Sequence, residues 1–218
     1  MEITDLTRTN QPEPRNKPEV RDGGYSFYAY LSRMRYISRW GLMRNSCPEN
    51  IQEHSHMVAV LAHALALISR EIFGRQTVSP ELCATMALFH DASEIITGDL
   101  PTPVKYYNDA MKSAYAEIED VINVKIINSL PEELRLSYAD YLQPDVSTEE
   151  YKLMKVADKL SAYVKSLEEK HVGNHDFDKA AKTNLKNLEE IEMPEVKCFM
   201  EDFLKSYSLT LDEMNLEN

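Results

Sequence analysis

Apolar residues recur at three- and four-residue steps along most of this chain, which is the pattern of helices with one buried face. The first such stripe follows Tyr25 and predicts a helix that ends at Arg39 and Trp40. Its members are Phe27, Tyr30, Leu31, Met34 and Ile37. Later stripes predict helices at roughly 50–73, 80–97 and 108–129, a short helix after Pro131, a long one at 147–173, and two more amphipathic helices before the chain ends.

Residues that start or interrupt helices flank these stripes. Ser79 and Pro80 supply an N-cap and a proline at the first helical position. Residues 147–150, Ser-Thr-Glu-Glu, match a capping box, and Asp176 is expected to cap a later helix. The prolines within residues 99–103 predict an ordered turn that is not helical.

The pattern contains no alternating strand segment, no internal repeat and no second composition regime. We therefore predict an all-α fold, a single helical bundle. Residues 1–24 include QPEPRNKPEVRDGG, which has no apolar period, and they predict a flexible polar N-terminal tail. The predicted organisation is a tail at 1–24 and one domain at 25–218.

Composition narrows the function. The 218 residues include 24 Lys and Arg against 36 Asp and Glu, a net charge of −12, which argues against binding a nucleic acid polymer or an anionic membrane. Only 6 Gly are present, too scattered for a Rossmann or P-loop fingerprint. The first ten residues lack the apolar core of a secretion signal, and the longest apolar stretch, residues 57–68, is too short to span a bilayer. We expect a cytoplasmic protein.

Candidate chemistry gathers at five residues. His90 and Asp91 are adjacent, and Glu94 follows at helical spacing, so three titratable groups share one surface. His54 lies near the start of the preceding predicted helix. Asp158 lies beside the apolar stripe of the long helix. Burying a carboxylate there without compensating partners would cost folding free energy on the order of several kcal/mol.

These residues occur in the order His, His-Asp, Asp, which resembles the HD-domain metal-dependent phosphohydrolases. That superfamily draws four metal ligands from separate helices of an all-α bundle. The segments that carry a closer resemblance are RWGLMRN, ENIQEHS, LFHDASEIITGDLPTPVKYYN and VADKLSAY. Together they are similar to the bacterial 5'-deoxynucleotidase (5'-nucleotidase, YfbR-like) family, from roughly Ser26 to the C-terminus.

The resemblance implies a role for each residue. His54, His90, Asp91 and Asp158 would hold the metal, and Glu94 would take a proton from the attacking water or orient it. Arg39 would hold the phosphate, because its fork matches phosphate oxygens, and Trp40 would crowd out a 2'-hydroxyl. The implied substrate contacts are Arg39, Trp40, Asp91, Asp99, Leu100, Pro101, Thr102 and Asp158, with Lys105 adding positive potential.

Two imidazoles and two carboxylates suit a divalent cation that keeps positions open for water and a phosphate oxygen. This set does not rank cobalt, manganese, zinc, iron and magnesium. A structural zinc site would more often use Cys, and none of the three Cys lies near these motifs, so we expect a catalytic site. Two-metal superfamily members carry an extra Lys soon after the His-Asp pair, whereas this chain has Ala92-Ser93-Glu94, which indicates one ion.

The expected function is a metal-dependent 5'-deoxynucleotidase that converts deoxyribonucleoside 5'-monophosphates to deoxyribonucleosides and phosphate. Two alternatives stay open: another HD-domain phosphohydrolase, with a cyclic nucleotide, dinucleotide or triphosphate substrate, and a non-catalytic nucleotide-binding helical protein. The resemblance also implies a homodimer. We expect no ligand role for His56, His171 or His175, and a core position for His63.

Overall fold

The computed structural model describes residues 22–214, and within them it contains ten α-helices and no strand. Most of the predicted tail, residues 1–21, lies outside the described residues. The helices are α1 (Phe27–Leu31), α2 (Ile51–Leu67), α3 (Pro80–Phe89), α4 (Glu94–Thr97), α5 (Thr102–Lys105), α6 (Asp109–Asn128), α7 (Glu132–Leu142), α8 (Glu149–His171), α9 (Asp178–Glu189) and α10 (Pro194–Asp202). Shorter helical turns are η1 (Ser32–Tyr36), η2 (Ile68–Ile72), η3 (His175–Phe177) and η4 (Leu204–Ser208). The all-α prediction is confirmed.

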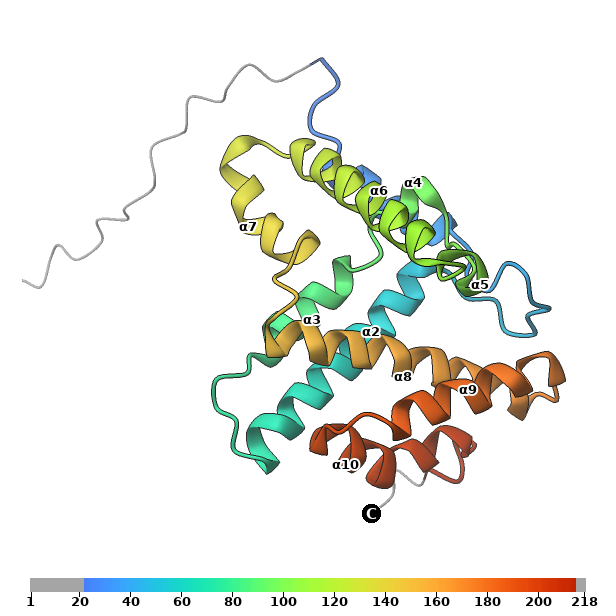
Figure 1. The fold of residues 1–218 in the computed structure, drawn as a ribbon. Helices are drawn as coiled ribbons and strands as arrows, with labels where there is room; N and C mark the ends of the chain where they lie inside the picture. The colour runs from blue at the N-terminus through green and yellow to red at the C-terminus, as the bar shows by residue number, and fades with distance from the viewer. Residues whose placement is uncertain (1–21, 215–218) are drawn as a thin grey trace, which may run out of the picture.

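Two apolar clusters form the interior. The larger one joins α2, α3 and α8 and is covered by α9 and α10; Leu61, Leu65 and Leu160 lie at its centre. The smaller one lies between α1, α6 and α7, around Phe27 and Leu130. Figure 1 shows α8 crossing the middle of the molecule, with α9 and α10 on one side of it and α6 and α7 on the other.

The segment that follows α3 connects the two clusters. Ala87, near the end of α3, belongs to the larger cluster, and Ala92 belongs to the smaller one. His90 and Asp91 stand between these two anchors. Packing on both sides therefore fixes the backbone of the His-Asp pair.

Helix α2 begins at a capping box in which the Asn50 side chain accepts from the amide of Glu53 and the Glu53 carboxylate accepts from the amide of Asn50. It continues through η2 to Ile72, and Gly74 follows with a positive φ, so the predicted helix at 50–73 is confirmed. The span Ile51–Ile72 is long and apolar enough to cross a membrane, but half of its most apolar window is buried inside the protein. Burial of this kind is typical of the core helix of a bundle. Val60 lies on the outer side of this helix and is 50% exposed.

The first predicted helix is shorter than expected. Helix α1 gives way to the 3₁₀ turn η1, and the backbone is extended by Ile37. The Ser32 hydroxyl donates to the carbonyl of Ala29, and pairing of Ser38 with Asn50 holds the next segment in an extended conformation. Arg39 and Trp40 therefore belong to a loop and do not end a helix.

The predicted helix at 80–97 begins as expected, because the Ser79 side chain accepts from the amide of Leu82. It is interrupted at residues 90–93, where tighter bonds run from the amide of Ala92 to Phe89 and from the amide of Glu94 to Asp91. Glu94 then starts α4. His90, Asp91 and Glu94 consequently lie on a helix end, a turn and a new helix, and not on one continuous helix face.

The proline-containing turn at 99–103 is only partly as predicted. Helix α5 starts at Thr102, with Pro103 in its first turn. The expectation that no helix passes through this segment is wrong at its C-terminal end, because amides in a first turn have no partner within the helix and a proline there loses nothing.

Two predicted caps are also corrected. The cap of α8 is Thr148, whose side chain accepts from the amide of Tyr151, and the Glu150 carboxylate accepts from the amide of Ser79 instead of closing a capping box. The cap of η3 is Asn174. Asp176 uses both carboxylate oxygens to bind Arg44, which leaves neither for a helix start.

Candidate metal centre and substrate site

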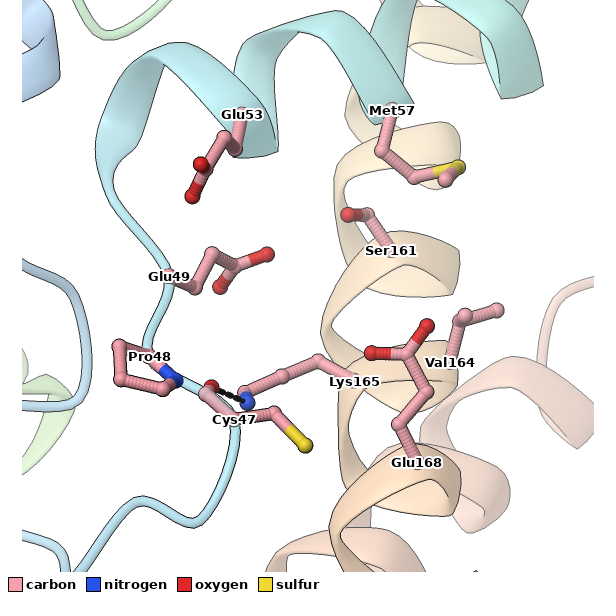
Figure 2. A pocket seen from close by; sticks show the side chains of 9 residues that line it. All are labelled: Cys47, Pro48, Glu49, Glu53, Met57, Ser161, Val164, Lys165 and Glu168. Atoms are coloured by element: carbon pink, nitrogen blue, oxygen red, sulfur yellow. Dashed lines mark hydrogen bonds between the residues drawn. The ribbon is translucent and has the colours of Figure 1, made fainter.

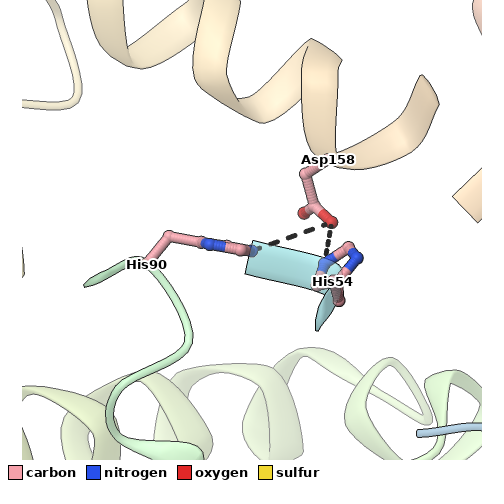
Figure 3. Close-up of side chains that lie close together, drawn as sticks. All are labelled: His54, His90 and Asp158. Atoms are coloured by element: carbon pink, nitrogen blue, oxygen red, sulfur yellow. Dashed lines mark hydrogen bonds and ion pairs between the residues drawn. The ribbon is translucent and has the colours of Figure 1, made fainter. Parts of the chain in front are cut away.

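Four side chains predicted as metal ligands converge from three parts of the fold. His54 comes from the first turns of α2, His90 and Asp91 from the end of α3, and Asp158 from the middle of α8. Figure 3 shows His54, His90 and Asp158 pointing toward one another. Helices α2, α3 and α8 pack against each other, so the bundle core itself brings the cluster together.

The distances between the donor atoms are short. Nε2 of His54 lies 3.1 Å from Oδ1 of Asp158 and 3.5 Å from Oδ2 of Asp91. Nε2 of His90 lies 3.1 Å from the same Asp91 oxygen and 4.0 Å from Oδ1 of Asp158. The ligand atoms of His54, His90 and Asp158 all lie within 4.8 Å of one another, a spacing that one ion can bridge.

Both imidazoles are held through the nitrogen that faces away from the carboxylates. Nδ1 of His90 donates to the carbonyl of Ala87 at 2.7 Å, and Nδ1 of His54 is 3.1 Å from the Ser161 hydroxyl. Partners of this kind fix the ring orientation of metal-binding histidines. Nε2 of His90 is buried, and although Oδ2 of Asp91 lies 3.1 Å away, it makes no well-aligned hydrogen bond with the described residues; a cation would satisfy this atom. The donor set fits a divalent ion.

The charges at the cluster favour the forms that bind a metal. Burial raises the pKa of Asp91, but the His90 and His54 imidazoles lower it more, so the net pKa lies below the usual range. Burial likewise raises the pKa of Asp158, and the Lys155 ammonium and the imidazoles outweigh this effect. Both carboxylates are therefore ionised. Burial lowers the pKa of His54, which keeps that imidazole neutral.

The pKa of His90 is raised. Burial alone would lower it, but the carboxylates of Asp91 and Asp158 raise it more. The direction of this shift shows that Asp91 and Asp158 concentrate negative charge around the His90 ring. A divalent cation neutralises that charge more completely than one proton does.

Glu94 lies beside the cluster and is 6% exposed. Burial, followed by the negative charges of Asp91 and Asp99, raises the pKa of its carboxyl to about 9, against smaller opposing effects of Lys105 and Arg39. Its Oε2 is buried without a hydrogen-bond partner in the described part of the chain. A carboxyl group in this setting can exchange a proton near neutral pH once positive charge is nearby.

Arg39 and Trp40 follow the extended residues 37 and 38. Nη1 of Arg39 donates to Oε2 of Glu49 at 2.7 Å, and the guanidinium lies 5.5 Å from the centre of the Trp40 ring. Burial lowers the pKa of Arg39, but nearby carboxylates raise it by more, so that the net pKa is raised. These carboxylates belong to Glu49, Asp91, Asp158 and Asp99. Arg39 therefore keeps its positive charge, and Asp91 and Asp158 lie near enough for their charges to act on it.

The proline turn lies against the loop that carries Arg39 and Trp40. Oδ2 of Asp99 accepts from the backbone amide of Trp40 at 3.1 Å, which joins the turn to the loop of Arg39. Leu100 and Pro101 are half-buried and Thr102 is exposed. Lys105 pairs with Glu119 at 3.0 Å and also contributes positive potential at Glu94.

Two residues near the cluster escaped the sequence analysis. Lys155 donates to Oδ2 of Asp158 at 2.9 Å, and the negative charges of Asp158 and Asp91 raise its pKa, against the effect of burial. Its position three residues before Asp158 places both on one helix face, a signal that was available in the sequence. Glu49, the partner of Arg39, gave no such signal, because the contact depends on how the loop folds.

The other histidines lie apart from the four predicted metal ligands. His56 is exposed, and His175 pairs with Asp178 on the surface. His63, expected in the core, is only half-buried. A cavity of about 190 Å³ lies behind the ligands, because its wall includes Ser161, the partner of His54 Nδ1 (Figure 2).

Known proteins are similar to this chain over most of its length. The family model for YfbR-like 5'-deoxynucleotidases matches residues 26–207. A protein named 5'-deoxynucleotidase from Photobacterium profundum is 46% identical, over 87% of this chain and 97% of its own. Another of that name from Erwinia tasmaniensis is 48% identical, over 88% of this chain and 97% of its own.

Solved structures support the fold and the kind of site. An HD-domain phosphohydrolase from Listeria innocua is 26% identical, with a TM-score of 0.73 over 84% of this chain and 88% of its own. A cyanophage S-2L HD phosphohydrolase, solved bound to dA and one catalytic Zn2+ ion, is 26% identical, with a TM-score of 0.59 over 84% of this chain and 96% of its own. With the matched family model covering most of its length, this chain belongs to the YfbR-like 5'-deoxynucleotidase family of HD-domain phosphohydrolases.

Proposed function

We propose that this protein is a metal-dependent 5'-deoxynucleotidase, which hydrolyses deoxyribonucleoside 5'-monophosphates to deoxyribonucleosides and phosphate. The observation that carries the proposal is the convergence of two imidazoles and two carboxylates beside a buried arginine, in a chain of this family. An arginine near a divalent-metal site is suited to a phosphate group, because its planar fork can bind two phosphate oxygens at once.

One divalent cation would be held by His54, His90, Asp91 and Asp158. When bound, such a cation acts as a Lewis acid that polarises a phosphoryl oxygen and lowers the pKa of water. The structural neighbour with one catalytic Zn2+ favours a single ion. Cobalt, manganese, zinc, iron and magnesium all remain compatible with this donor set.

The chain's own groups perform the remaining steps. Arg39 binds the phosphate and offsets the negative charge that grows on it, and Lys155 adds a second positive charge at Asp158. A water molecule attacks phosphorus while Glu94 accepts its proton. The bond from phosphorus to the 5'-oxygen breaks, the proton held by Glu94 passes to that oxygen directly or through water, and the nucleoside leaves as the alcohol. Positive charge at the ligand cluster favours the ionised form of Glu94 that accepts the proton.

The sugar would lie between Trp40 and the proline turn. In this arrangement Trp40 limits the space at the 2'-carbon, and residues 99–102 contact the sugar and the phosphate. Asp91 and Asp158 would face both the ion and the substrate. Asp99 has one oxygen engaged by the Trp40 amide, so its other oxygen is the one available for substrate.

A nucleotide panel tests the proposal. Purified protein is assayed with dAMP, dGMP, dCMP and TMP, with and without EDTA, and the metal content of the same preparation is measured. We expect release of inorganic phosphate that EDTA abolishes and that an added divalent metal restores. Release of pyrophosphate or triphosphate from other nucleotides would indicate a different HD-domain reaction, and the absence of metal-dependent phosphate release would exclude the proposal.

The proposal extends to the organisation of the chain. We assign residues 25–218 to one HD domain and residues 1–24 to a flexible tail, and we place the protein in the cytoplasm as a homodimer. Light scattering coupled to gel filtration tests the dimer against the monomer mass of 25.1 kDa. Limited proteolysis tests the tail, because cleavage confined to residues 1–24 should leave the phosphatase activity intact.

A further inference from the structure

Trp40 has a backbone conformation that its own side chain disfavours. Its φ is 61°, and it is the only described residue other than glycine with a positive φ. A bulky residue persists in this conformation only when its surroundings hold it there, and such positions are frequent at functional sites. The contacts of Trp40 therefore indicate which side-chain arrangement this loop maintains.

Several contacts hold Trp40, including a bond from the Met43 amide to its carbonyl and the Arg39 guanidinium near its ring. Its backbone amide donates to Asp99, its indole Nε1 donates to Oε2 of Glu49 at 3.0 Å, and its ring lies 5.2 Å from the ring of Phe177. Only the bond to Glu49 sets the direction of the indole edge. Aromatic packing alone leaves a ring free to slide or tilt.

The same oxygen of Glu49 also binds Arg39. Oε2 accepts from Arg39 Nη1 at 2.7 Å, and both side chains are largely buried, 13% and 14% exposed. The backbone brings them together, because the Arg39 amide donates to the Glu49 carbonyl at 2.9 Å and Ser38 pairs with Asn50. In Figure 2, Glu49 lies on the loop before α2, across the cavity from α8.

We infer that Glu49 is a positioning residue that sets the preference for deoxyribose over ribose. The inference rests on the proposed function, in which Arg39 holds the phosphate and Trp40 limits the space at the 2'-carbon. One carboxylate oxygen fixes the spacing between these two side chains, and this spacing determines how closely the indole approaches the sugar of a phosphate-anchored nucleotide. Without Glu49, the indole can move and a 2'-hydroxyl has room.

The test compares Glu49→Ala with wild type. We expect the ratio of kcat/KM for dAMP to kcat/KM for AMP to fall by about tenfold or more, which is the size of a lost hydrogen bond to a charged group. Trp40 is the only tryptophan of the chain, so intrinsic fluorescence reports its position directly. Quenching of that fluorescence by acrylamide should increase in the variant.

Glu168→Ala is the matched control. Glu168 lines the same cavity as Glu49, and neither Arg39 nor Trp40 donates a hydrogen bond to it. The control variant should keep both the substrate ratio and the quenching of wild type. If Glu49→Ala does not fold, Glu49→Leu fills the same space without an acceptor, and the same outcomes apply.

The readouts separate the inference from the proposed function. A wild type that hydrolyses neither dAMP nor AMP refutes the proposed function, and with it the role of Glu49 in sugar preference. A wild type that prefers dAMP, together with a folded Glu49 variant of unchanged substrate ratio, overturns the inference alone. Lower activity with both nucleotides in equal proportion also overturns it, because that result indicates only a structural role.

Discussion

At the scale of single residues, the metal site depends on which nitrogen of each histidine is free. His54 has its Nδ1 beside Ser161, and this contact leaves Nε2 facing Asp158. The Ser161 hydroxyl touches no other predicted ligand. It is thus the simplest position at which to test whether ring orientation matters for the ion.

Ser161→Ala should weaken metal binding between about 10- and 100-fold, the usual effect of losing a hydrogen-bond partner of a metal-binding histidine. Competition with a chelator measures the affinity. Ser166→Ala serves as the control, because this buried serine of the same helix donates only to the Ala162 carbonyl. Equal affinities in both variants would mean that Ser161 does not orient His54.

Glu94 allows a second test at this scale. Glu94→Gln keeps the shape of the side chain but cannot accept the proton of water, so kcat should fall by about 10²- to 10⁴-fold. The metal content and KM should stay close to those of wild type, because Glu94 is not among the proposed ligands. A variant that retains the wild-type kcat would exclude Glu94 as the base.

At the scale of elements, helix α8 serves the site along one face, because residues 158, 161, 165 and 169 follow one another at helical spacing. Asp158 faces the cluster, and one turn beyond Ser161 the buried pair Lys165 and Glu169 holds the loop before α2. Glu169 accepts from the amides of residues 46 and 47, and Lys165 donates to the carbonyl of Cys47. The loop that ends at Glu49 is thereby fastened to the same helix that carries Asp158, a proposed metal ligand.

The Glu169 contact predicts a pH dependence of stability. Burial raises the pKa of this carboxyl, but hydrogen bonds from Lys165 and the loop amides outweigh the burial and lower it to about 2. Because the pKa of Glu169 is lower in the folded state, its carboxylate stabilises the fold at pH values above its ordinary pKa of 4.5. This stabilisation is lost as the pH falls toward 2. This pKa shift corresponds to about 3 kcal/mol of folding free energy.

Glu169→Gln should therefore lower the free energy of unfolding at pH 7 by up to about 3 kcal/mol, and the difference from wild type should shrink below about pH 4.5. Urea unfolding at pH 7, 5 and 3 measures it. Glu168→Gln, a change at an exposed neighbour, should have little effect at any of these pH values. A difference for Glu169→Gln that is the same at all three would contradict the assignment.

The long helices were predictable because their signals are local. Apolar periodicity marked α2, α6 and α8, and a single N-cap such as Ser79 fixed where α3 begins. The errors occurred where distant residues compete for a local group. Arg44 takes the carboxylate of Asp176, Ser79 takes that of Glu150, and pairing with the segment before α2 ends the first helix early.

From the sequence alone, the site could be predicted only as a set of residue types that occur in a particular order along the chain. The sequence singled out His54, His90, Asp91 and Asp158, and the resemblance implied their common ion, but no periodicity shows that they meet. Glu49 is the first residue of the segment ENIQEHS, but nothing in the sequence assigned it a role, because its partners depend on a loop conformation with a positive φ at Trp40. A contact of this kind becomes visible only once the loop is folded.

At the scale of the whole molecule, the four proposed metal ligands lie where the two apolar clusters meet. His54 and Asp158 come from helices of the larger cluster, and Asp91 directly precedes Ala92 of the smaller one. Four polar side chains and a concentration of negative charge occupy this junction in place of apolar contacts. The ion should therefore contribute to the stability of the fold as well as to the reaction.

Removal of the metal should lower Tm. A ligand present at 100 times its Kd stabilises the folded state by about 2.7 kcal/mol, and for a chain of this size each kcal/mol changes Tm by about 2 to 4 °C. Thermal melting of EDTA-treated protein, before and after adding back a divalent metal, should show a difference of about 5 to 10 °C. Asp158→Ala should show almost no such difference, because it removes a ligand and disrupts the site that joins the clusters. If the metal raised Tm equally in this variant, the ion would be binding elsewhere on the acidic surface, and the four residues would not be its ligands.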